Sequence, residues 1–349
     1  MQITQKLFGK MEEKEIIEYT LKNNQGMEVS CLNYGGIVTR VIVPNKEGKL
    51  ENVVLNYASL DEYLNDTYYF GALIGRVAGR IKGATFELNG KTHSLEINDN
   101  RNNLHGGKKG FNRVIWDTEL LENEEEVAIK LMYHSPDGEE GFPGNINVEV
   151  LYTLNNHNEW KISYKGNSDE QTILNMTNHT YFNLSGNAKR DILQHQMQLK
   201  SDKVLELDQE LLPTGEWISV ENTPFDFQER ATIEKGVLAD HEQTILAGNG
   251  YDHPFLLNAH NDQEIQLIDE ESGRILTIET EEEGVVIYSG NQMEEKGMVS
   301  GVPCRKYLGI CLETQGLPDA IHHSAFRSWV IDKDRPYQTE TVYRFDVIK

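Results

Sequence analysis

Hydrophobic and polar residues alternate along much of the chain with a period of two. The clearest runs are Val127–Tyr133, Val148–Leu154 and Trp160–Tyr164, in which every second residue is aliphatic or aromatic. Because successive side chains of a strand point to opposite faces of its sheet, this pattern predicts strands with one buried face. The chain should therefore be rich in half-buried β-strands.

Glycine-containing turns separate several of the predicted strands. Asn89-Gly90 lies between Thr85–Leu88 and Lys91–Leu95, and an Asn-Gly pair readily adopts the positive φ angles that a tight hairpin requires. Residues 138–144 contain three glycines, which indicate a longer loop between two other strands. Both features favour strands connected by local turns.

Helix signals are few and short. Ser59 and Glu62 have the spacing of a capping box that opens a helix of about two turns, and Ala231–Leu238 is expected to form another turn or two. Many strands, scarce helices and no ordered β-α-β alternation favour an all-β fold, a large and mostly antiparallel β-sandwich with a few short helices. No linker or repeat divides the chain, so residues 1–349 are expected to form a single domain.

The composition matters mainly through what it excludes. A formal net charge of −23 argues against nucleic acid and anionic membranes as partners. No run approaches the roughly 20 apolar residues that cross a bilayer, and the N-terminal residues contain no apolar signal segment. The three cysteines, Cys31, Cys304 and Cys311, favour a reducing compartment over a disulfide-linked fold. We therefore expect a cytoplasmic protein.

Two glycine-flanked segments contain candidate binding residues. Gly75–Ile81 includes Arg76 and Arg80, and a guanidinium can donate paired hydrogen bonds to sugar oxygens or to a carboxylate. The alternative for these arginines is an internal Arg–Glu pair. Asn103–Gly107 includes His105, for which the alternative is a turn residue bonded to the backbone. Neither segment has the spacing of a phosphate-binding loop.

Two further segments offer groups that can transfer protons. In Asn175–Leu184, His179 has polar neighbours, and Tyr181 follows on the same strand face, where its ring can pack on the C–H patches of a sugar. Glu313 follows the apolar run Tyr307–Cys311, and burial there would raise its proton affinity. The alternatives are a structural polar strand for the first segment and a core Glu–Arg pair for the second.

The residue types narrow the chemistry further. No serine or cysteine has a recognisable nucleophile context, and the histidines, including His322-His323, lack the spacing of a zinc site. A histidine with a carboxylate is the simplest general acid–base pair. Arg80 and Asp252 would orient a polyhydroxyl ligand, and tyrosines would pack against it. We expect no metal and no cofactor.

Taken together, these motifs resemble those of the aldose 1-epimerases, or galactose mutarotases. The resemblance runs from Asn33–Gly36 to Pro318–Ala320, and Thr177–Leu184 is close to the family's signature. Five other segments follow in the family's order: Gly75–Ile81, Leu104–Gly107, Ser135–Gly144, Leu212–Glu216 and Leu312–Gln315. The fold that this resemblance implies is a very large antiparallel β-sandwich, the galactose mutarotase-like supersandwich.

The resemblance also implies roles for individual residues. Glu313 is expected to be the general base and His179 the general acid. The expected substrate-binding residues are Arg80, His105, Asp252, Tyr181 and Gly79. Some members of the family carry Asn at the position of Gly79 and Gln at that of Val286, so the preferred sugar stays open.

The implied activity is the interconversion of the α and β anomers of free aldohexoses, such as glucose and galactose, by acid–base catalysed ring opening and reclosure. A sugar-binding protein without turnover and a hexose-phosphate epimerase of the same fold are the alternatives. A glycoside hydrolase is less favoured, because hydrolases use two carboxylates and the partner of Glu313 here is a histidine. The expected partner is a small sugar, bound by a monomer or homodimer.

Overall fold

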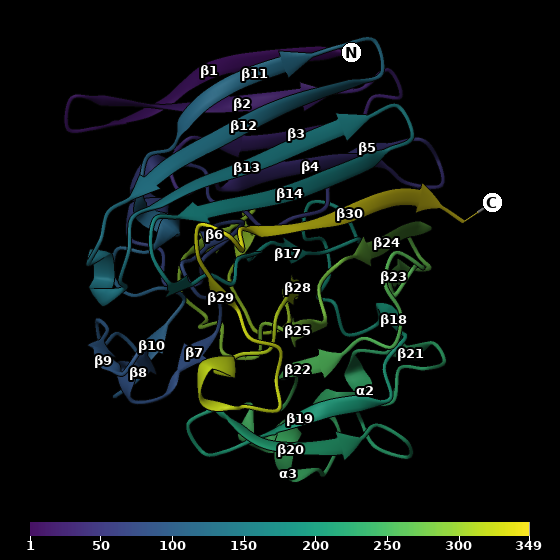
Figure 1. Ribbon diagram of the computed structural model, residues 1–349. Coiled ribbons are helices and arrows are strands. Elements are labelled where there is room, and N and C mark those ends of the chain that lie inside the picture. Colours follow the sequence, from purple (N-terminus) through teal and green to yellow (C-terminus); the bar gives the residue numbers. More distant parts are fainter. Residues whose placement is uncertain (349) are drawn as a thin grey trace.

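The computed structural model describes residues 1–348, which are organised mainly in β-strands (Figure 1). Neighbouring strands of the three large sheets pair antiparallel throughout. The expected all-β fold, a large antiparallel β-sandwich with a few short helices, is therefore confirmed.

One layer of the sandwich is a nine-stranded sheet with the order β11-β12-β13-β14-β30-β24-β23-β18-β21. The bounds are β11 (Asp117–Glu122), β12 (Glu126–Ser135), β13 (Ile146–Asn155), β14 (Glu159–Ser168), β30 (Tyr337–Val347), β24 (Arg274–Thr280), β23 (Ile265–Asp269), β18 (Gln196–Leu199) and β21 (Ala231–Thr232). The three runs with the clearest alternation form the adjacent strands β12, β13 and β14, and β30 joins them to β24 (Figure 1).

The other layer is a five-stranded sheet joined edge to edge with a six-stranded sheet. The first contains β1 (Gln2–Met11), β2 (Lys14–Lys22), β3 (Glu28–Leu32), β4 (Val38–Pro44) and β5 (Leu50–Asn52) in that order. The second has the order β17 (Tyr181–Phe182), β28 (Ile310–Gln315), β25 (Gly284–Tyr288), β22 (Asp252–Leu256), β19 (Lys203–Leu207) and β20 (Pro213–Ser219). Hydrogen bonds from Leu55 N to Tyr181 O and from Asn183 N to Val53 O connect them.

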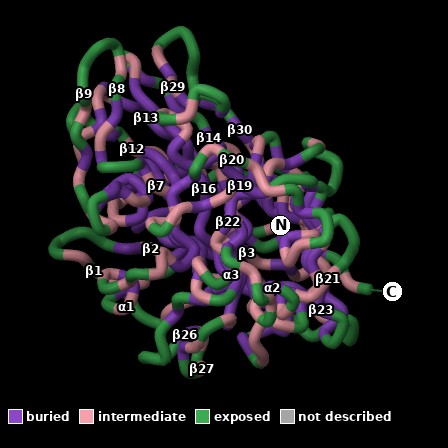
Figure 2. The backbone as a smooth tube through the Cα atoms, turned by 90° about the horizontal axis from the view of Figure 1, so that it is seen from below, coloured by how far each residue is buried: buried purple, intermediate pink, exposed green. Residues whose placement is uncertain are grey.

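The hydrophobic core lies between the two layers. Ile129 and Tyr152 of the nine-stranded sheet, Val41 of the five-stranded sheet, and Phe255 and Leu312 of the six-stranded sheet belong to one cluster, and each is at most 1 % exposed. Figure 2 shows the buried segments running through the interior, with exposed residues concentrated in the loops. Burial of apolar surface, at about 25 cal/mol per Å², is the main force that holds the layers together.

The predicted hairpin and capping box are both present. β8 (Thr85–Leu88) and β9 (Lys91–Ser94) pair around Asn89-Gly90, and both turn residues have positive φ. Ser59 caps α1 (Leu60–Leu64): its hydroxyl accepts from the backbone N–H of Glu62, whose carboxylate accepts in return from the N–H of Ser59. The local sequence signals therefore predict these two elements correctly.

The other helices match the sequence less closely. The segment 231–238 is helical only in its second half, as α2 (Glu234–Val237), because Ala231–Thr232 pair with β18 as strand β21. The sequence gives no expectation for α3 (Glu242–Leu246), whose N-cap is His241 rather than a hydroxyl, Asp or Asn residue. Within residues 1–348, no helix has the length and apolar character needed to cross a bilayer.

Several short strand pairs lie outside the large sheets, and two of them bring motif segments together. They are β6 (Leu73–Ile74) with β16 (Thr177–Asn178), β7 (Arg80–Ile81) with β10 (Asn103–Leu104), β15 (Thr172–Ile173) with β29 (Val330–Ile331), and β26 (Met298–Val299) with β27 (Val302–Pro303). The first two pairs carry the segments in which Arg80, His105 and His179 lie.

A buried ion pair connects the two layers of the sandwich. Arg274 on β24 donates to Glu51 on β5 at 2.9 Å, and each side chain is 1 % exposed. Burial alone would raise the pKa of Glu51, but hydrogen bonds from Lys189, Lys49 and Arg274 lower it to about 2. The carboxylate therefore stabilises the fold in its charged form, and this contribution is lost as the pH falls from about 4.5 towards 2.

Arg274→Met is expected to lower the free energy of unfolding by about 3 kcal/mol at pH 7, because it removes the buried partner of a buried charge. Urea denaturation measures this loss. Lys49→Met is the matched control, since Lys49 contacts the same carboxylate but is 64 % exposed, and it should cost less than about 1 kcal/mol. Equal losses in the two variants would contradict a dominant role for the buried pair.

Candidate active site

A pocket opens on the face of the six-stranded sheet that is turned away from the hydrophobic core. Its cavity volume is about 190 Å³. The residues that line it are Thr67, Tyr68, Tyr69, Gly79, Arg80, Leu104, His105, His179, Tyr181, Leu207, Leu211, Pro213, Asp252, Pro254, Val286, Tyr288, Gln292, Glu313, Gln315 and Pro318. The structure thus brings together all seven residues that the sequence analysis assigns to the site.

Strand alternation determines which side chains reach this pocket. The pocket-facing pairs are Glu313 and Gln315 on β28, Val286 and Tyr288 on β25, and Asp252 and Pro254 on β22. The residues between the members of each pair, Thr314, Ile287 and His253, are buried on the other side of the sheet or within it. In the ladder, Val286 is opposite Glu313, so neighbouring strands present their pocket residues side by side.

Two short strands place Arg80 and His105 in the pocket wall. The N–H of His105 donates to the carbonyl oxygen of Gly79 at 3.0 Å, and the N–H of Gly79 donates to Nδ1 of His105 at 3.2 Å. Because Nδ1 accepts, the neutral imidazole carries its proton on Nε2. Gly79 has a φ of +75°, and a Cβ there would lie 2.9 Å from Pro318 Cβ, so only glycine fits without strain.

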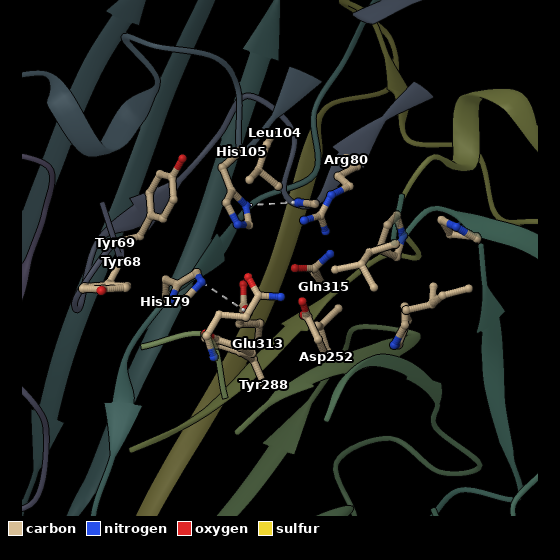
Figure 3. A pocket seen from close by; sticks show the side chains of 18 of the residues that line it. Tyr68, Tyr69, Arg80, Leu104, His105, His179, Asp252, Tyr288, Glu313 and Gln315 are labelled. Atoms are coloured by element: carbon tan, nitrogen blue, oxygen red, sulfur yellow. Dashed lines mark hydrogen bonds and ion pairs between the residues drawn. The ribbon is translucent and has the colours of Figure 1, made fainter. Parts of the chain in front are cut away.

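His179 and Glu313 approach each other inside the pocket (Figure 3). Nε2 of His179 lies 3.6 Å from Oε1 of Glu313, and the two residues are 5 % and 3 % exposed. Burial lowers the pKa of His179 to about 4. Burial also raises the pKa of Glu313 well above its usual range; the charge of Asp252 raises it further, and that of Arg80 opposes the shift.

These shifts mean that burial disfavours charge on both groups. The arrangement favours a protonated carboxyl beside a neutral imidazole over the ion pair. Both forms contain the same single proton, so the pair titrates as a unit. Glu313 has no ion pair with an arginine in the described residues, so it is not the core Glu–Arg pair that the sequence leaves open.

A thiol lies behind His179. Sγ of Cys311 is 3.4 Å from Nδ1 of His179, and both residues are buried. Burial raises the pKa of the Cys311 thiol well above its usual range, so the group stays protonated. A thiol is a weak donor and a weak acceptor, and it therefore orients the ring without fixing its charge, whereas a carboxylate in this place would favour the imidazolium.

Arg80 and Asp252 supply hydrogen-bonding groups farther along the pocket (Figure 3). Nε of Arg80 is fixed by an ion pair with Asp99 at 2.7 Å. Burial raises the pKa of Asp252, an effect that Arg80 opposes and Asp99 increases. The pocket thus combines donors and acceptors of the kind that position hydroxyl groups.

Two of the tyrosines that line the pocket pack against its imidazoles. Tyr181 is 1 % exposed, its hydroxyl donates to the carbonyl oxygen of Tyr68 at 2.9 Å, and its ring lies 5.1 Å from that of His179. Tyr69 is half-buried and lies 4.8 Å from the ring of His105 and 5.7 Å from that of His179. The Tyr181 ring therefore packs against the ring of His179, and Tyr69 borders the space beside both imidazoles.

Arg76, unlike Arg80, belongs to the framework. It is 2 % exposed, and its guanidinium donates to the Ser135 hydroxyl and to the backbone carbonyls of Ser135, Pro136 and Pro143. These bonds hold the glycine-rich loop 135–144 in place. The two arginines of this motif therefore have different functions, and only Arg80 lines the pocket.

His105, His179 and Glu313 form the one group of three potential metal ligands in the described part of the chain, with ligand atoms within 4.8 Å of one another. A metal-bound histidine normally donates its second N–H to an acceptor. His105 instead faces the N–H of Gly79, which leaves its Nδ1 occupied and its Nε2 protonated. The three residues therefore fit hydrogen bonding and proton transfer better than metal coordination.

Several lining residues receive no role in the sequence analysis, among them Tyr68, Tyr69, Tyr288 and Gln315, although Gln315 lies in the motif Leu312–Gln315. Tyr288 and Gln315 lie two positions from Val286 and Glu313, so strand alternation is a signal that identifies them. Tyr68 and Tyr69 precede the motif Gly75–Ile81 in a loop and carry no such periodic signal.

Comparison with known proteins gives consistent matches. A sequence model of the family described as aldose 1-epimerase matches residues 18–344. The chain is 35 % identical to the galactose mutarotase of Bos taurus and 32 % identical to the maltose epimerase of Levilactobacillus brevis, covering 99 % of each chain in both cases. Its fold superposes on the crystal structure of galactose 1-epimerase from Lactobacillus acidophilus with a TM-score of 0.89 at 28 % identity, covering 100 % of this chain and 99 % of that one.

Neutralising Glu313 is expected to stabilise the fold increasingly as the pH rises. Below about pH 4.5 the carboxyl is protonated in the folded and unfolded states, so Glu313→Gln gains nothing there. Above it, the unfolded chain releases a proton that the buried group retains, and wild-type stability falls until the pH reaches the raised folded-state pKa.

Urea denaturation of Glu313→Gln and wild type should therefore diverge from about pH 4.5 upward and reach a difference of at least about 1 kcal/mol near neutrality, the scale of a buried polar group relieved of its charge. Glu122→Gln, on an exposed part of β11, is the control and should show no such trend. Parallel stability curves for Glu313→Gln and wild type would refute the burial argument.

Proposed function

Because the chain belongs to the aldose 1-epimerase family, we propose that Glu313 and His179 are the acid–base pair with which this isomerase interconverts the α and β anomers of free aldohexoses. The observation that carries the proposal is the 3.6 Å approach of Nε2 to Oε1 inside the pocket, with both groups almost fully buried.

Ring opening requires one proton to leave the sugar as another arrives. In the proposed step the carboxylate of Glu313 takes the proton of the C1 hydroxyl, the C1–O5 bond breaks as the C1 carbonyl forms, and the imidazolium of His179 donates its proton to O5. Rotation about C1–C2 then presents the other face of the aldehyde. Reclosure reverses both transfers: His179 takes the proton from the C5 hydroxyl, and Glu313 returns a proton to the carbonyl oxygen.

The pair of groups carries one proton both before and after ring opening. Before ring opening the pair is an ion pair, and afterwards it is a protonated carboxyl beside a neutral imidazole. The second form is the one that burial favours, so the environment supports the ring-opening direction of transfer. The sugar itself moves the proton between the two groups, and no proton is exchanged with water.

Other residues of the pocket are proposed to hold the sugar in place. Nε2–H of His105 and the guanidinium of Arg80 can donate to ring or hydroxyl oxygens, and Asp252 can accept from hydroxyls. Tyr69 offers a ring face for the C–H groups of a pyranose. Gly79 contributes through its backbone, since its N–H is bonded to His105.

The substrates are proposed to be glucose and galactose, in keeping with the small-sugar chemistry of the family. Two relatives with similar identity to this chain are named for different sugars, one as a galactose mutarotase and the other as a maltose epimerase. Gly79 and Val286 lack the polar side chains that some members of the family carry at these positions. The preference of this chain therefore depends on the remaining polar groups of its pocket.

Two alternatives make different demands on the pocket. A glycoside hydrolase needs two carboxylates flanking a glycosidic bond, and Asp252 and Glu313 both line the pocket; cleavage of chromogenic glycosides would reveal that activity. A hexose-phosphate epimerase needs several cations, and Arg80 is the only arginine or lysine among the lining residues described. A binding protein without turnover would leave the rate of anomer exchange unchanged.

We propose that residues 1–349 act as a single domain in the cytoplasm, as a monomer or homodimer, without a metal or cofactor.

Glu313→Gln is expected to lower the enzymatic rate of mutarotation of fresh α-glucose by about 10²–10⁴-fold, because the variant cannot accept the C1 hydroxyl proton. Polarimetry measures the rate above the spontaneous background, and circular dichroism checks that the variant is folded. Glu122→Gln is the control and should keep wild-type activity. Near-normal mutarotation in Glu313→Gln would reject the proposed base.

The pH dependence of kcat/KM is expected to be bell-shaped, because only the singly protonated pair is active. The acid limb should lie below the usual range of histidine, since burial lowers the pKa of His179 to about 4, and the basic limb should follow the raised pKa of Glu313.

Asp252→Asn tests this assignment, because the negative charge of Asp252 raises the pKa of Glu313. Removing that charge makes the ionised carboxylate less costly, so the basic limb should move to lower pH even if the maximal rate also falls. A basic limb that stays in place or moves upward would contradict the proposed origin of the limb.

A further inference from the structure

Gln315 is a buried polar residue that the proposed mechanism does not use. It lies on β28 two residues after Glu313, is 1 % exposed, and lines the same pocket. Side chains two residues apart on a strand share a face of the sheet. The Gln315 carboxamide and the proposed base therefore face the same ligand.

Hydrogen bonding fixes the orientation of this carboxamide. Its Nε2 donates to the carbonyl oxygen of Gly316 at 3.2 Å. Asn175 holds Gly316 in place, since it donates to the same carbonyl oxygen at 3.0 Å and accepts from the N–H of Gly316 at 2.9 Å. A carbonyl can only accept, so the nitrogen of Gln315 must face Gly316 and the oxygen must point away from it.

The oxygen that points away has no partner. Oε1 of Gln315 is buried and accepts no hydrogen bond from any residue within 1–348. Native proteins pair nearly all buried polar atoms, so each exception requires an explanation. Because the residue lines the pocket, a ligand that donates a hydrogen bond there supplies the missing partner.

The neighbouring side chains match a hydroxyl group in that place. In Figure 3 the carboxamide lies between the labelled side chains of Arg80 and Asp252. A hydroxyl both donates and accepts, so it is satisfied by an acceptor such as Oε1 together with a donor such as the Arg80 guanidinium. The adjacent strand offers no competing polar side chain, since Gly284 is opposite Gln315 and Val286 is opposite Glu313.

We propose that Oε1 of Gln315 accepts a hydrogen bond from the C3 or C4 hydroxyl of the aldohexose and so determines which sugars react. This inference rests on the proposed function, which places C1 at Glu313. Two residues along a strand span roughly 6.6 Å, which is too far for the hydroxyl next to C1 and suits one on the opposite side of the ring.

The test compares wild type and Gln315→Met on glucose and on its 2-, 3-, 4- and 6-deoxy analogues by polarimetry. Methionine has a similar length but no strong acceptor, so kcat/KM for glucose should fall about tenfold. For the analogue that lacks the contacted hydroxyl, 3-deoxy- or 4-deoxyglucose, the two proteins should have equal kcat/KM. Gln5→Met, at an exposed position of the distant strand β1, controls for the substitution itself.

Three outcomes would overturn the inference. In the first, Gln315→Met has the same kcat/KM for glucose as wild type. In the second, kcat/KM falls equally with every analogue, which indicates a purely structural role. In the third, the fall in kcat/KM disappears only with 2-deoxy- or 6-deoxyglucose. Failure of the proposed function is recognised separately, because wild type itself would then show no mutarotation of glucose.

Discussion

The close approach of a dehydrated imidazole and a dehydrated carboxyl group is the constraint on which the site depends. Neither His179 nor Glu313 has enough contact with water to carry its charge cheaply. Charge is therefore tolerated on them only together, and only while a ligand or a nearby group compensates it. A pair of this kind can pass protons to and from a hemiacetal without becoming trapped as a stable ion pair. The weak thiol partner of His179 fits this balance, since it does not hold the imidazole in its cationic form.

The fold keeps water away from His179 and Glu313. Its inner surfaces form the apolar core, and the back of the six-stranded sheet would face water if short strand pairs and loops did not cover it. That cover brings Arg80 and His105 over the sheet, and the reciprocal hydrogen bonds between Gly79 and His105 make part of it rigid. Stability and chemistry are thus assigned to opposite faces of the same strands, and this division allows Glu313 and Gln315 to be buried without disturbing the core.

Much of this arrangement can be predicted from the sequence, and the limits have physical causes. The alternation in Val127–Tyr133, the Asn89-Gly90 turn and the Ser59 capping box are local signals, and the corresponding elements are present. The motif around His179 and the one around Glu313 also identify two segments that meet in space. The edge-to-edge joining of two sheets depends instead on pairing between Leu55 and Tyr181, which are far apart in the chain.

Within the site, too, the sequence indicates the residues that have local signals and does not indicate those placed by contacts between distant parts of the chain. The proposed proton-transfer groups lie in segments with distinctive residue patterns, Thr177–Leu184 and Leu312–Gln315, and are therefore conspicuous. The position of Tyr69 beside two imidazoles follows from the path of a loop, which no local pattern specifies. The support that Tyr181 gives to His179 depends on a hydrogen bond to a backbone carbonyl more than a hundred residues away. The expectation that Tyr181 binds substrate stays a prediction: the residue lines the pocket, and its ring also packs against that of His179.

Finally, the pocket depends on the alternation of side chains along its strands, because only every second residue faces it. Odd-numbered and even-numbered residues of β28 lie on opposite faces of the sheet. Inserting or deleting one residue there would move a carboxylate into the hydrophobic core and turn a leucine towards the pocket. A substitution in β28 therefore alters one face of the sheet at one position, whereas a change in the length of the strand alters the core and the pocket together.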